Sequence, residues 1–174
     1  MEIWDLYDNH GNKTGLTVMR GEPIPEGYYY MAIHVCIFNR EGKMLIQKRV
    51  KEKKAWPGVW DFTAGGGSVK GDTSQSAVAR ELYEELGLKM SFESARPYLT
   101  VHFSQGFDDI YVADRDVDLN TLTLQPEEVE AVAWASREEI LAMIDKGEFV
   151  PYHKPLVELI FDMRKRRDAI ASCP

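Results

Sequence analysis

The chain has little cysteine and no long hydrophobic run. Its 174 residues include two cysteines, Cys36 inside an apolar stretch and Cys173 next to the C-terminus. Neither has a partner at metal-ligand spacing, and the pair does not form a disulfide framework. No segment approaches the roughly 20 apolar residues that a membrane-spanning helix needs. These absences argue against a disulfide-stabilised scaffold, a cysteine-bound metal module and a membrane-spanning protein.

Targeting signals, repeats and linkers are also missing. The first residues, Met1-Glu2-Ile3-Trp4-Asp5, have neither the basic region nor the apolar stretch of a signal peptide, so we expect a cytoplasmic location. The length suffices for one proper hydrophobic core. We therefore predict a single domain over residues 1–174, with an N-terminal hairpin over residues 1–27 as an extension. This hairpin is compatible with a homodimer.

Positive charge is in short supply. The chain has 21 lysines and arginines against 28 acidic residues, which gives a net charge of −7. This balance argues against a general nucleic-acid-binding surface. An acidic protein that handles anionic phosphates must supply local cations or a metal ion.

The hydrophobic pattern predicts a mixed sheet flanked by helices. Alternation of apolar and polar residues indicates an N-terminal hairpin with strands at 3–7 and 14–19. Helical periodicity appears at 137–146 and 155–169. Layers of this kind are expected to enclose one core. Further strands are expected at residues 28–38, 44–49, 60–63, 98–104, 110–114 and 129–135.

A glycine-rich segment followed by an acidic helix is the most informative pattern. We expect the glycines at 65–67 to form a loop that lets the backbone approach a ligand closely. The helix should begin at an N-cap, Asp72 or Thr73, and end at Gly87 in the C′ position.

Three glutamates are predicted to share one face of this helix. Glu81, Glu84 and Glu85 fall within an arc of about 100°, beside an apolar core face. Like charges at this spacing repel by a few tenths of a kcal/mol per pair. A hard cation such as Mg²⁺ or Mn²⁺ would turn that repulsion into a binding site. The alternative is an ordinary solvated acidic face.

The segment from Gly66 to Leu88 resembles the Nudix box, G-x5-E-x7-R-E-U-x-E-E-x-G-U, where U is a bulky aliphatic residue. Every fixed position matches except the first glutamate, which is Asp72 here. The resemblance implies an α/β/α sandwich with a mixed β-sheet. It also implies a pyrophosphohydrolase that uses Mg²⁺ or Mn²⁺ to cleave a diphosphate linkage in a small molecule, here a nucleoside-diphosphate derivative.

The resemblance also implies roles for individual residues. Glu81, Glu84 and Glu85 would ligate the metal together with the backbone carbonyl of Gly65. Arg80 would orient the acidic side chains, although a simple surface pair with Glu84 is the alternative.

Asp72 is one methylene shorter than the family's glutamate. We therefore favour a role as helix cap over a reach to Arg80 or to a metal-bound water.

Two further positions complete the predicted site. Glu84 is the preferred general base, and Glu128 is the alternative, because an acid from this region often completes the metal site in Nudix proteins. An ordinary acidic turn explains Glu128 equally well. Strand alternation sends Lys48 and Arg49 to opposite sides of the sheet. Arg49 is the predicted substrate contact, since arginine binds phosphate in a bidentate manner.

Aromatic residues are expected to pack in the core, although each could stack on a base or contact an isoprenoid group. His34 is likewise expected to be a packed polar residue rather than a metal ligand. The aromatic residues considered are Tyr28, Tyr29, Tyr30, Trp56, Trp60 and Phe107.

Two other functions stay open. The runs Tyr7-Asp8, Gln47-Lys48-Arg49 and Trp60-Asp61 look similar to the subgroup related to isopentenyl diphosphate isomerase. Type I isomerases use a cysteine after the tryptophan-containing strand, where this chain has residues 63–65, Thr-Ala-Gly, and Cys36 lies on another predicted strand. A non-catalytic nucleotide-sensing domain is the second alternative, but such regulators usually carry an eroded box. We favour the hydrolase.

Overall fold

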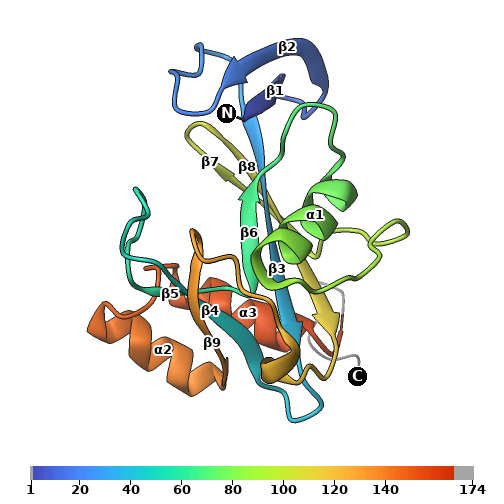
Figure 1. Ribbon diagram of the computed structural model, residues 1–174. Helices are drawn as coiled ribbons and strands as arrows, with labels where there is room; N and C mark the ends of the chain where they lie inside the picture. The colour runs from blue at the N-terminus through green and yellow to red at the C-terminus, as the bar shows by residue number, and fades with distance from the viewer. Residues whose placement is uncertain (1, 167–174) are drawn as a thin grey trace.

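The computed structural model describes residues 2–166 as a sheet between two helical layers (Figure 1). Within these residues, helix α1 (Ser74–Leu86) covers one face of a seven-stranded mixed sheet. Helices α2 (Arg137–Lys146) and α3 (Lys154–Met163) cover the other face. The expected α/β/α sandwich is confirmed. The strands are β3 (Tyr30–Phe38), β4 (Met44–Arg49), β5 (Trp60–Asp61), β6 (Ala64–Gly67), β7 (Leu99–Phe103), β8 (Gly106–Asp114) and β9 (Val129–Ala135).

Two neighbouring strands separate and divide the sheet into halves. Strands β3 and β4 pair antiparallel only where Phe38 faces Met44. Beyond that point β3 pairs with β6 and, in parallel, with β8. Strand β4 pairs instead with β5 and β9. Because the two halves diverge, side chains between them are not covered by a neighbouring strand.

Strand β3 is apolar on both sides because both of its faces are covered. Residues Ile33, Val35 and Ile37 pack in the cluster beneath α1. Cys36 and Phe38 pack in the cluster beneath α2 and α3. The alternation of side chains along a strand therefore divides the buried apolar residues of β3 between two cores.

The N-terminal hairpin forms a separate two-stranded sheet of β1 (Ile3–Tyr7) and β2 (Lys13–Met19). Tyr7 is buried in the core beneath α1. The Lys70 backbone N–H donates to the carbonyl of Ile3 at 2.7 Å, and that of Gly71 donates to the Asp5 carboxylate at 2.8 Å. The hairpin is therefore fixed against the loop that leads into α1.

Most predicted elements are present, and the differences have physical causes. The predicted strands at 3–7, 44–49 and 129–135 and the helix at 137–146 have their expected bounds. The predicted loop of glycines is wrong, because β6 pairs with Ala32–Val35 of β3. Backbone hydrogen bonds from β3 hold these glycines in a strand, although glycine itself has a low strand propensity.

Several bounds differ, and β8 and α3 show the largest differences. Strand β8 begins at Gly106 rather than at residue 110, because β3 and β7 pair with it from both sides. Helix α3 ends at Met163. The predicted helical residues 167–169 lie outside the described part of the chain. No helix among the described residues is long and apolar enough to cross a membrane.

Candidate active site

Thr73, and not Asp72, caps helix α1. The Thr73 hydroxyl accepts the Ser76 backbone N–H at 3.1 Å, and the Ser76 hydroxyl accepts the Thr73 N–H at 2.9 Å. This reciprocal pair is a capping box, which satisfies backbone donors at the helix start. Gly87 ends the helix with φ 67°. Our prediction that Asp72 caps the helix is therefore wrong, while the predicted stop at Gly87 is confirmed.

Asp72 binds the arginine of the box instead. The Arg80 guanidinium donates to Asp72 Oδ2 from Nε at 3.2 Å and from Nη2 at 3.0 Å. The Ser76 hydroxyl donates to the other carboxylate oxygen at 2.9 Å. Asp72 reaches Arg80 despite its short side chain.

Arg80 connects Asp72 to two of the three helix glutamates. Its Nη1 lies 2.8 Å from Glu81 Oε1 and 3.0 Å from Glu84 Oε2. Its Nη2 also donates to the carbonyl of Gly67 at 3.3 Å. Burial opposes the charge, but Glu81 and Asp72 outweigh it and raise the pKa of Arg80. A permanently charged guanidinium therefore holds these carboxylates side by side.

Glu85 is buried, so the three glutamates do not form the ordinary solvated face that was the alternative to a metal site. Its exposed fraction is 4%. Gln47 Nε2 donates to Glu85 Oε2 at 2.9 Å, and the Gly65 backbone N–H donates to the same atom at 3.2 Å. Burial and the nearby Glu81 raise the pKa of Glu85 to about 7. By contrast, the Glu84 side chain is 49% exposed.

The glycines of β6 give three side chains room to approach the backbone. A β-carbon at Gly66 would lie 2.6 Å from the Glu81 carboxylate carbon. One at Gly65 would lie 2.3 Å from the ring of His34, and one at Gly67 would lie 2.8 Å from the indole of Trp4. Contacts this short would force the neighbouring groups to move, so the absence of side chains on β6 shapes the site.

Two adjoining cavities lie along β6. The acidic cavity, of about 50 Å³, is lined by Glu2, Arg20, Lys53, Gly65, Gly66, Gly67, Glu81, Glu84, Glu85, Gln125 and Glu128. The aromatic cavity, of about 330 Å³, has among its lining Trp4, Arg20, Tyr30, His34, Arg49, Lys53, Trp56, Asp61 and Tyr152. Both cavities share Arg20, Lys53 and residues 65–67. The two cavities therefore adjoin beside two cations.

A chain of polar side chains lines the aromatic cavity. Arg49 Nη1 donates to Asp61 Oδ2 at 3.1 Å, and the Tyr152 hydroxyl donates to Asp61 Oδ1 at 2.8 Å. His34 Nδ1 lies 2.7 Å from Asp108 Oδ2. Burial would lower the pKa of His34, but Asp108, with smaller effects from Asp61 and Glu85, raises it to about 9. The imidazole is therefore charged at neutral pH.

Arg49 and Lys48 face different partners, as strand alternation predicts. Lys48 Nζ lies 2.9 Å from Glu130. Arg49 lines the aromatic cavity and donates to the backbone carbonyls of Ala55 and Trp56 as well as to Asp61. The structure thus brings Arg49 beside a cavity, while several of its donors are engaged within the protein.

Glu128 lies at the acidic cavity, where Lys53 forms an ion pair with it. The neighbouring Glu127 is exposed and does not line the cavity. Glu128 thus joins the helix glutamates, although it comes from the turn before β9.

The carboxylates at the acidic cavity fit a hard divalent cation. Within residues 2–166, no three potential ligand side chains already converge as a metal site. Arg80 holds Glu81 and Glu84, and Gln47 holds Glu85. A cation would have to draw these oxygens from their present partners. Five carboxylates line this one small cavity, which is the oxygen-rich donor set that Mg²⁺ and Mn²⁺ prefer.

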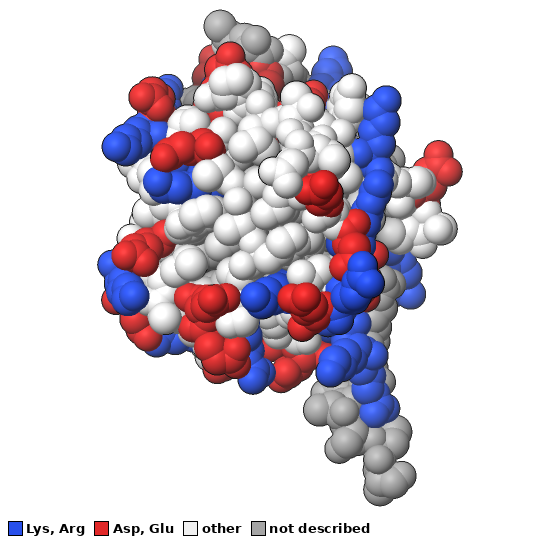
Figure 2. Space-filling model, turned by 60° about the horizontal axis from the view of Figure 1, so that its bottom comes forward, with Lys and Arg blue, Asp and Glu red and all other residues white. Residues whose placement is uncertain are grey.

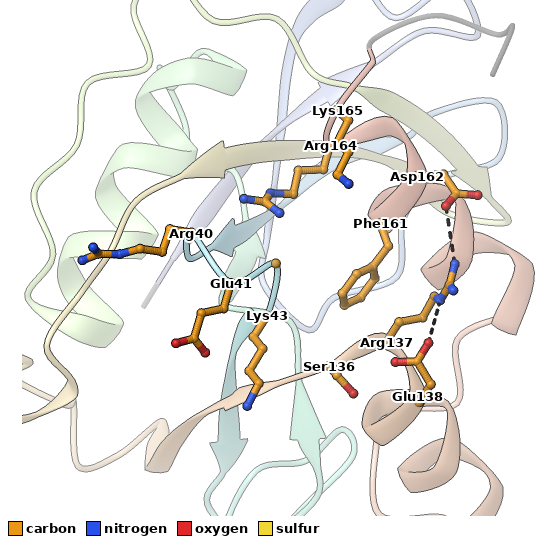
Figure 3. A pocket seen from close by; sticks show the side chains of 11 residues that line it. Arg40, Glu41, Lys43, Ser136, Arg137, Glu138, Phe161, Asp162, Arg164 and Lys165 are labelled. Atoms are coloured by element: carbon orange, nitrogen blue, oxygen red, sulfur yellow. Dashed lines mark hydrogen bonds and ion pairs between the residues drawn. The ribbon is translucent and has the colours of Figure 1, made fainter. Parts of the chain in front are cut away.

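The opposite end of the molecule lacks such a cluster. A hollow of about 530 Å³ lies among the β3–β4 turn, the start of α2 and the end of α3 (Figure 3). Its charges are largely paired: Arg137 lies 3.2 Å from Glu138 and 3.5 Å from Asp162. On the face shown in Figure 2, acidic and basic side chains alternate around a largely uncharged centre. The acidic and aromatic cavities together are therefore the candidate site.

Comparison with known proteins assigns the chain to a family. The model of the NUDIX domain matches residues 29–159. The chain belongs to the Nudix family. An uncharacterized Nudix hydrolase of Listeria monocytogenes is 46% identical over 152 residues, which cover 87% of this chain and 90% of that protein. Nudix hydrolase 3 of Arabidopsis thaliana is 36% identical over 166 residues, covering 87% of this chain and 22% of that protein.

More distant relatives include isomerases and solved Nudix folds. An isopentenyl-diphosphate Delta-isomerase of Citrobacter koseri is 25% identical over 143 residues, which are 78% of each protein. The crystal structure of DR0079 from Deinococcus radiodurans superposes with a TM-score of 0.72 at 24% identity, over 91% of this chain and 97% of that one. This likeness shows the Nudix fold.

Several residues of the site escaped sequence reasoning. Trp4 and Arg20 come from the hairpin, outside the segment that matches the family model. Tyr152 comes from the segment before α3. No motif joins these positions, and only the fold brings them together. Trp56 was expected in the core, but its exposed fraction is 52%.

Proposed function

We propose that this Nudix hydrolase cleaves a diphosphate linkage in a nucleoside-diphosphate derivative, with Mg²⁺ or Mn²⁺ as cofactor. The observation that carries the proposal is that the two cavities adjoin. The shared lining includes Arg20 and Lys53, two cations suited to a diphosphate between the cavities. The group attached to the diphosphate would then occupy the aromatic cavity.

The acidic cavity would hold the metal. Glu81, Glu84, Glu85 and the carbonyl of Gly65 are the proposed ligands. A metal bound there would polarise the phosphoryl group and lower the pKa of a water molecule. The oxygen of water would form a bond to phosphorus as the diphosphate P–O bond breaks, which yields a nucleotide and a phosphorylated group.

Protein groups would position and activate these reactants. Glu84 is the proposed general base, because it is the most solvent-accessible of the three helix glutamates. Glu128 is the alternative, since it lines the same cavity. Arg80 would keep Glu81 and Glu84 aligned through its hydrogen bonds. Arg49 would contact substrate with its remaining N–H groups.

Isopentenyl-diphosphate isomerisation is the second candidate, because isomerases are among the relatives. The position after the tryptophan-containing strand holds Thr63, Ala64 and Gly65 rather than cysteine. Cys36 is fully buried in the core beneath α2 and α3. These observations favour the hydrolase, and the intact acids of the box favour it over a nucleotide sensor.

A substrate screen tests the proposal. Nucleoside-diphosphate derivatives that are capped at both ends of the diphosphate would be incubated with Mg²⁺ or Mn²⁺, and phosphate would be measured after phosphatase coupling. Isopentenyl diphosphate would be incubated without phosphatase, and both its isomer and free phosphate would be measured. We expect release from at least one nucleoside compound, and its loss in the Glu84→Gln variant. Conversion of isopentenyl diphosphate to its isomer without phosphate release would overturn the hydrolase in favour of the isomerase.

A further inference from the structure

Trp56 combines an unusual backbone with an exposed indole. Its φ is 49°, and among the described residues no other non-glycine residue has a positive φ. A bulky side chain in this region is an outlier that costs energy unless its surroundings impose it. Pro57 follows directly, and residues before proline normally adopt an extended backbone. The conformation therefore conflicts with two local preferences.

Arg49 holds this conformation in place. Its Nε lies 3.2 Å from the carbonyl oxygen of Trp56, and its Nη2 lies 3.0 Å from that of Ala55. The same guanidinium is anchored to Asp61 at 3.1 Å. One side chain thus ties the loop before β5 to the floor of the aromatic cavity. The strained backbone is a built feature of the cavity rather than a free loop.

The result of this arrangement is an aromatic ring placed at the aromatic cavity. Trp56 lines that cavity, yet 52% of the residue stays exposed. No stacking partner within the described residues covers its ring, whereas Trp4 stacks on Tyr30 with centroids 4.4 Å apart. The Trp56 indole therefore offers free surface to a ligand.

The polar lining of the cavity selects the chemistry of that ligand. The Arg49–Asp61 and His34–Asp108 pairs belong to residues at or beside the cavity wall. A hydrocarbon chain would displace water from these polar groups without forming hydrogen bonds to them, which weakens binding. A planar heterocycle stacks on indole and also carries hydrogen-bonding edges.

We propose that Trp56 is a specificity-determining residue that stacks on an aromatic heterocycle of the substrate, with Arg49 as the positioning residue of its loop. This inference rests on the proposed function, because it assigns the aromatic cavity to the group attached to the diphosphate. It goes further in naming the residue that distinguishes a base from an isoprenoid chain.

Binding of non-hydrolysable probes tests the inference without requiring turnover. The probes are the α,β-methylene analogues of ADP, GDP, CDP and UDP, methylenediphosphonate without a base, and the methylene analogue of isopentenyl diphosphate. Calorimetry with Mg²⁺ would compare the wild type with Trp56→Ala and Trp56→Phe. Tyr83→Ala is the matched control, because Tyr83 is 50% exposed and lines neither cavity.

We expect at least one base-carrying analogue to bind more tightly than methylenediphosphonate. Trp56→Ala should weaken that analogue about 10- to 100-fold, which is the scale of one base-stacking contact. Trp56→Phe should retain most of the affinity, and binding of methylenediphosphonate should not change. Tyr83→Ala should behave as the wild type.

Three results would overturn the inference. No base-carrying analogue exceeds methylenediphosphonate, or Trp56→Ala keeps the full preference, or the isopentenyl analogue loses affinity by the same factor. A Trp56-dependent preference without hydrolysis of any diphosphate would refute the proposed function alone. Hydrolysis that is indifferent to Trp56 would refute this inference alone.

Discussion

The acidic and aromatic cavities share one strand but arise from the sequence in opposite ways. Three of the five carboxylates of the acidic cavity come from helix α1, and Glu2 and Glu128 join them from the N-terminal segment and from the turn before β9. The aromatic cavity draws Trp4, Tyr30, Trp56 and Tyr152 from segments far apart in the chain. The chemistry of the site is therefore local in the sequence, whereas the lining that would select a substrate is dispersed.

The two cavities also differ in how their charges are held. In the acidic cavity, carboxylates crowd together and burial raises the pKa of Glu81 and Glu85. In the aromatic cavity, Asp61 is the one carboxylate of the lining among the described residues, and it pairs with Arg49 while Arg20 and Lys53 line the cavity as well. Negative charge is in excess in the acidic cavity and positive charge in the aromatic cavity, so a cation should affect the two unequally.

Removal of metal should have the largest effect, and only through the acidic cavity. We expect activity to require millimolar Mg²⁺ or Mn²⁺ and to vanish in excess EDTA, because the clustered carboxylates are the hard ligands of the site. Initial rates with and without chelator provide the measurement. Full turnover in EDTA would contradict the metal mechanism.

Neutralising one glutamate of the Nudix box should have the second-largest effect on activity. Glu84→Gln should lower kcat by roughly a hundredfold or more, as for loss of a metal ligand or general base. The fold should persist, because the Glu84 side chain is 49% exposed. Steady-state kinetics and circular dichroism would be compared. A kcat near the wild-type value would show that the assigned role is wrong.

Substitutions at the adjacent positions Asp72 and Thr73 should have different effects, one on metal binding and the other on stability. Asp72→Asn removes the negative charge that binds Arg80, and we expect metal affinity to fall roughly 10-fold. Thr73→Ala removes the helix cap and should lower stability by about 1 kcal/mol with little effect on rate. The Mg²⁺ dependence of kcat and the Tm of both variants provide the test. Equal effects on both measurements would refute this separation.

Glu85 should make the metal-free protein less stable as the pH rises. Its pKa is about 7 in the folded protein and roughly 4.3 in an unfolded chain, so the folded state binds more protons between these values. The free energy of unfolding should therefore fall from pH 4.3 to pH 7 and stay lower above it. Glu85→Gln lacks this loss.

The difference between Glu85→Gln and the wild type gives the measurement. In EDTA at pH 8, we expect the variant to be more stable by an amount on the order of 1–3 kcal/mol. The advantage should shrink toward pH 5. Thermal unfolding at both pH values would check this, and an advantage that does not depend on pH would exclude Glu85 titration as its cause.

Cys36 should have the smallest effect on rate. It is fully buried in the core beneath α2 and α3. Cys36→Ser should lower the Tm, because it buries a hydroxyl among apolar side chains, but leave kcat largely intact. Loss of activity by alkylation of Cys36 in the native protein would instead support the isomerase.

Local patterns predicted the elements best where packing and propensity agree. Strand β4 and helix α2 have their expected bounds, since β4 is a short apolar run that follows a turn and α2 has a helical period with a cap at each end. Strand β6 was missed because three glycines carry no strand signal. Its hydrogen bonds come from β3, about 30 residues earlier in the chain, and such pairing leaves no local trace.

The candidate site divides in the same way. The helix period placed three glutamates on one face, but it did not reveal that Glu85 is buried against Gln47 of β4. Pairing of Asp72 with Arg80 depends on the path of the loop before α1, which side-chain length alone does not predict. The assigned roles of the site residues stay predictions until the variants are measured.

The sequence by itself determined the family, the helix of the box and the chemistry that its carboxylates can perform. These depend on spacing along one helix, and helical geometry converts spacing into position. Tertiary structure alone decided the burial of Glu85, the formation of the aromatic cavity and the placement of Trp56. These depend on the divergence of β3 from β4 and on the docked hairpin. Contacts between distant segments are selected by packing and by satisfaction of buried polar groups, and neither leaves a pattern in any one segment.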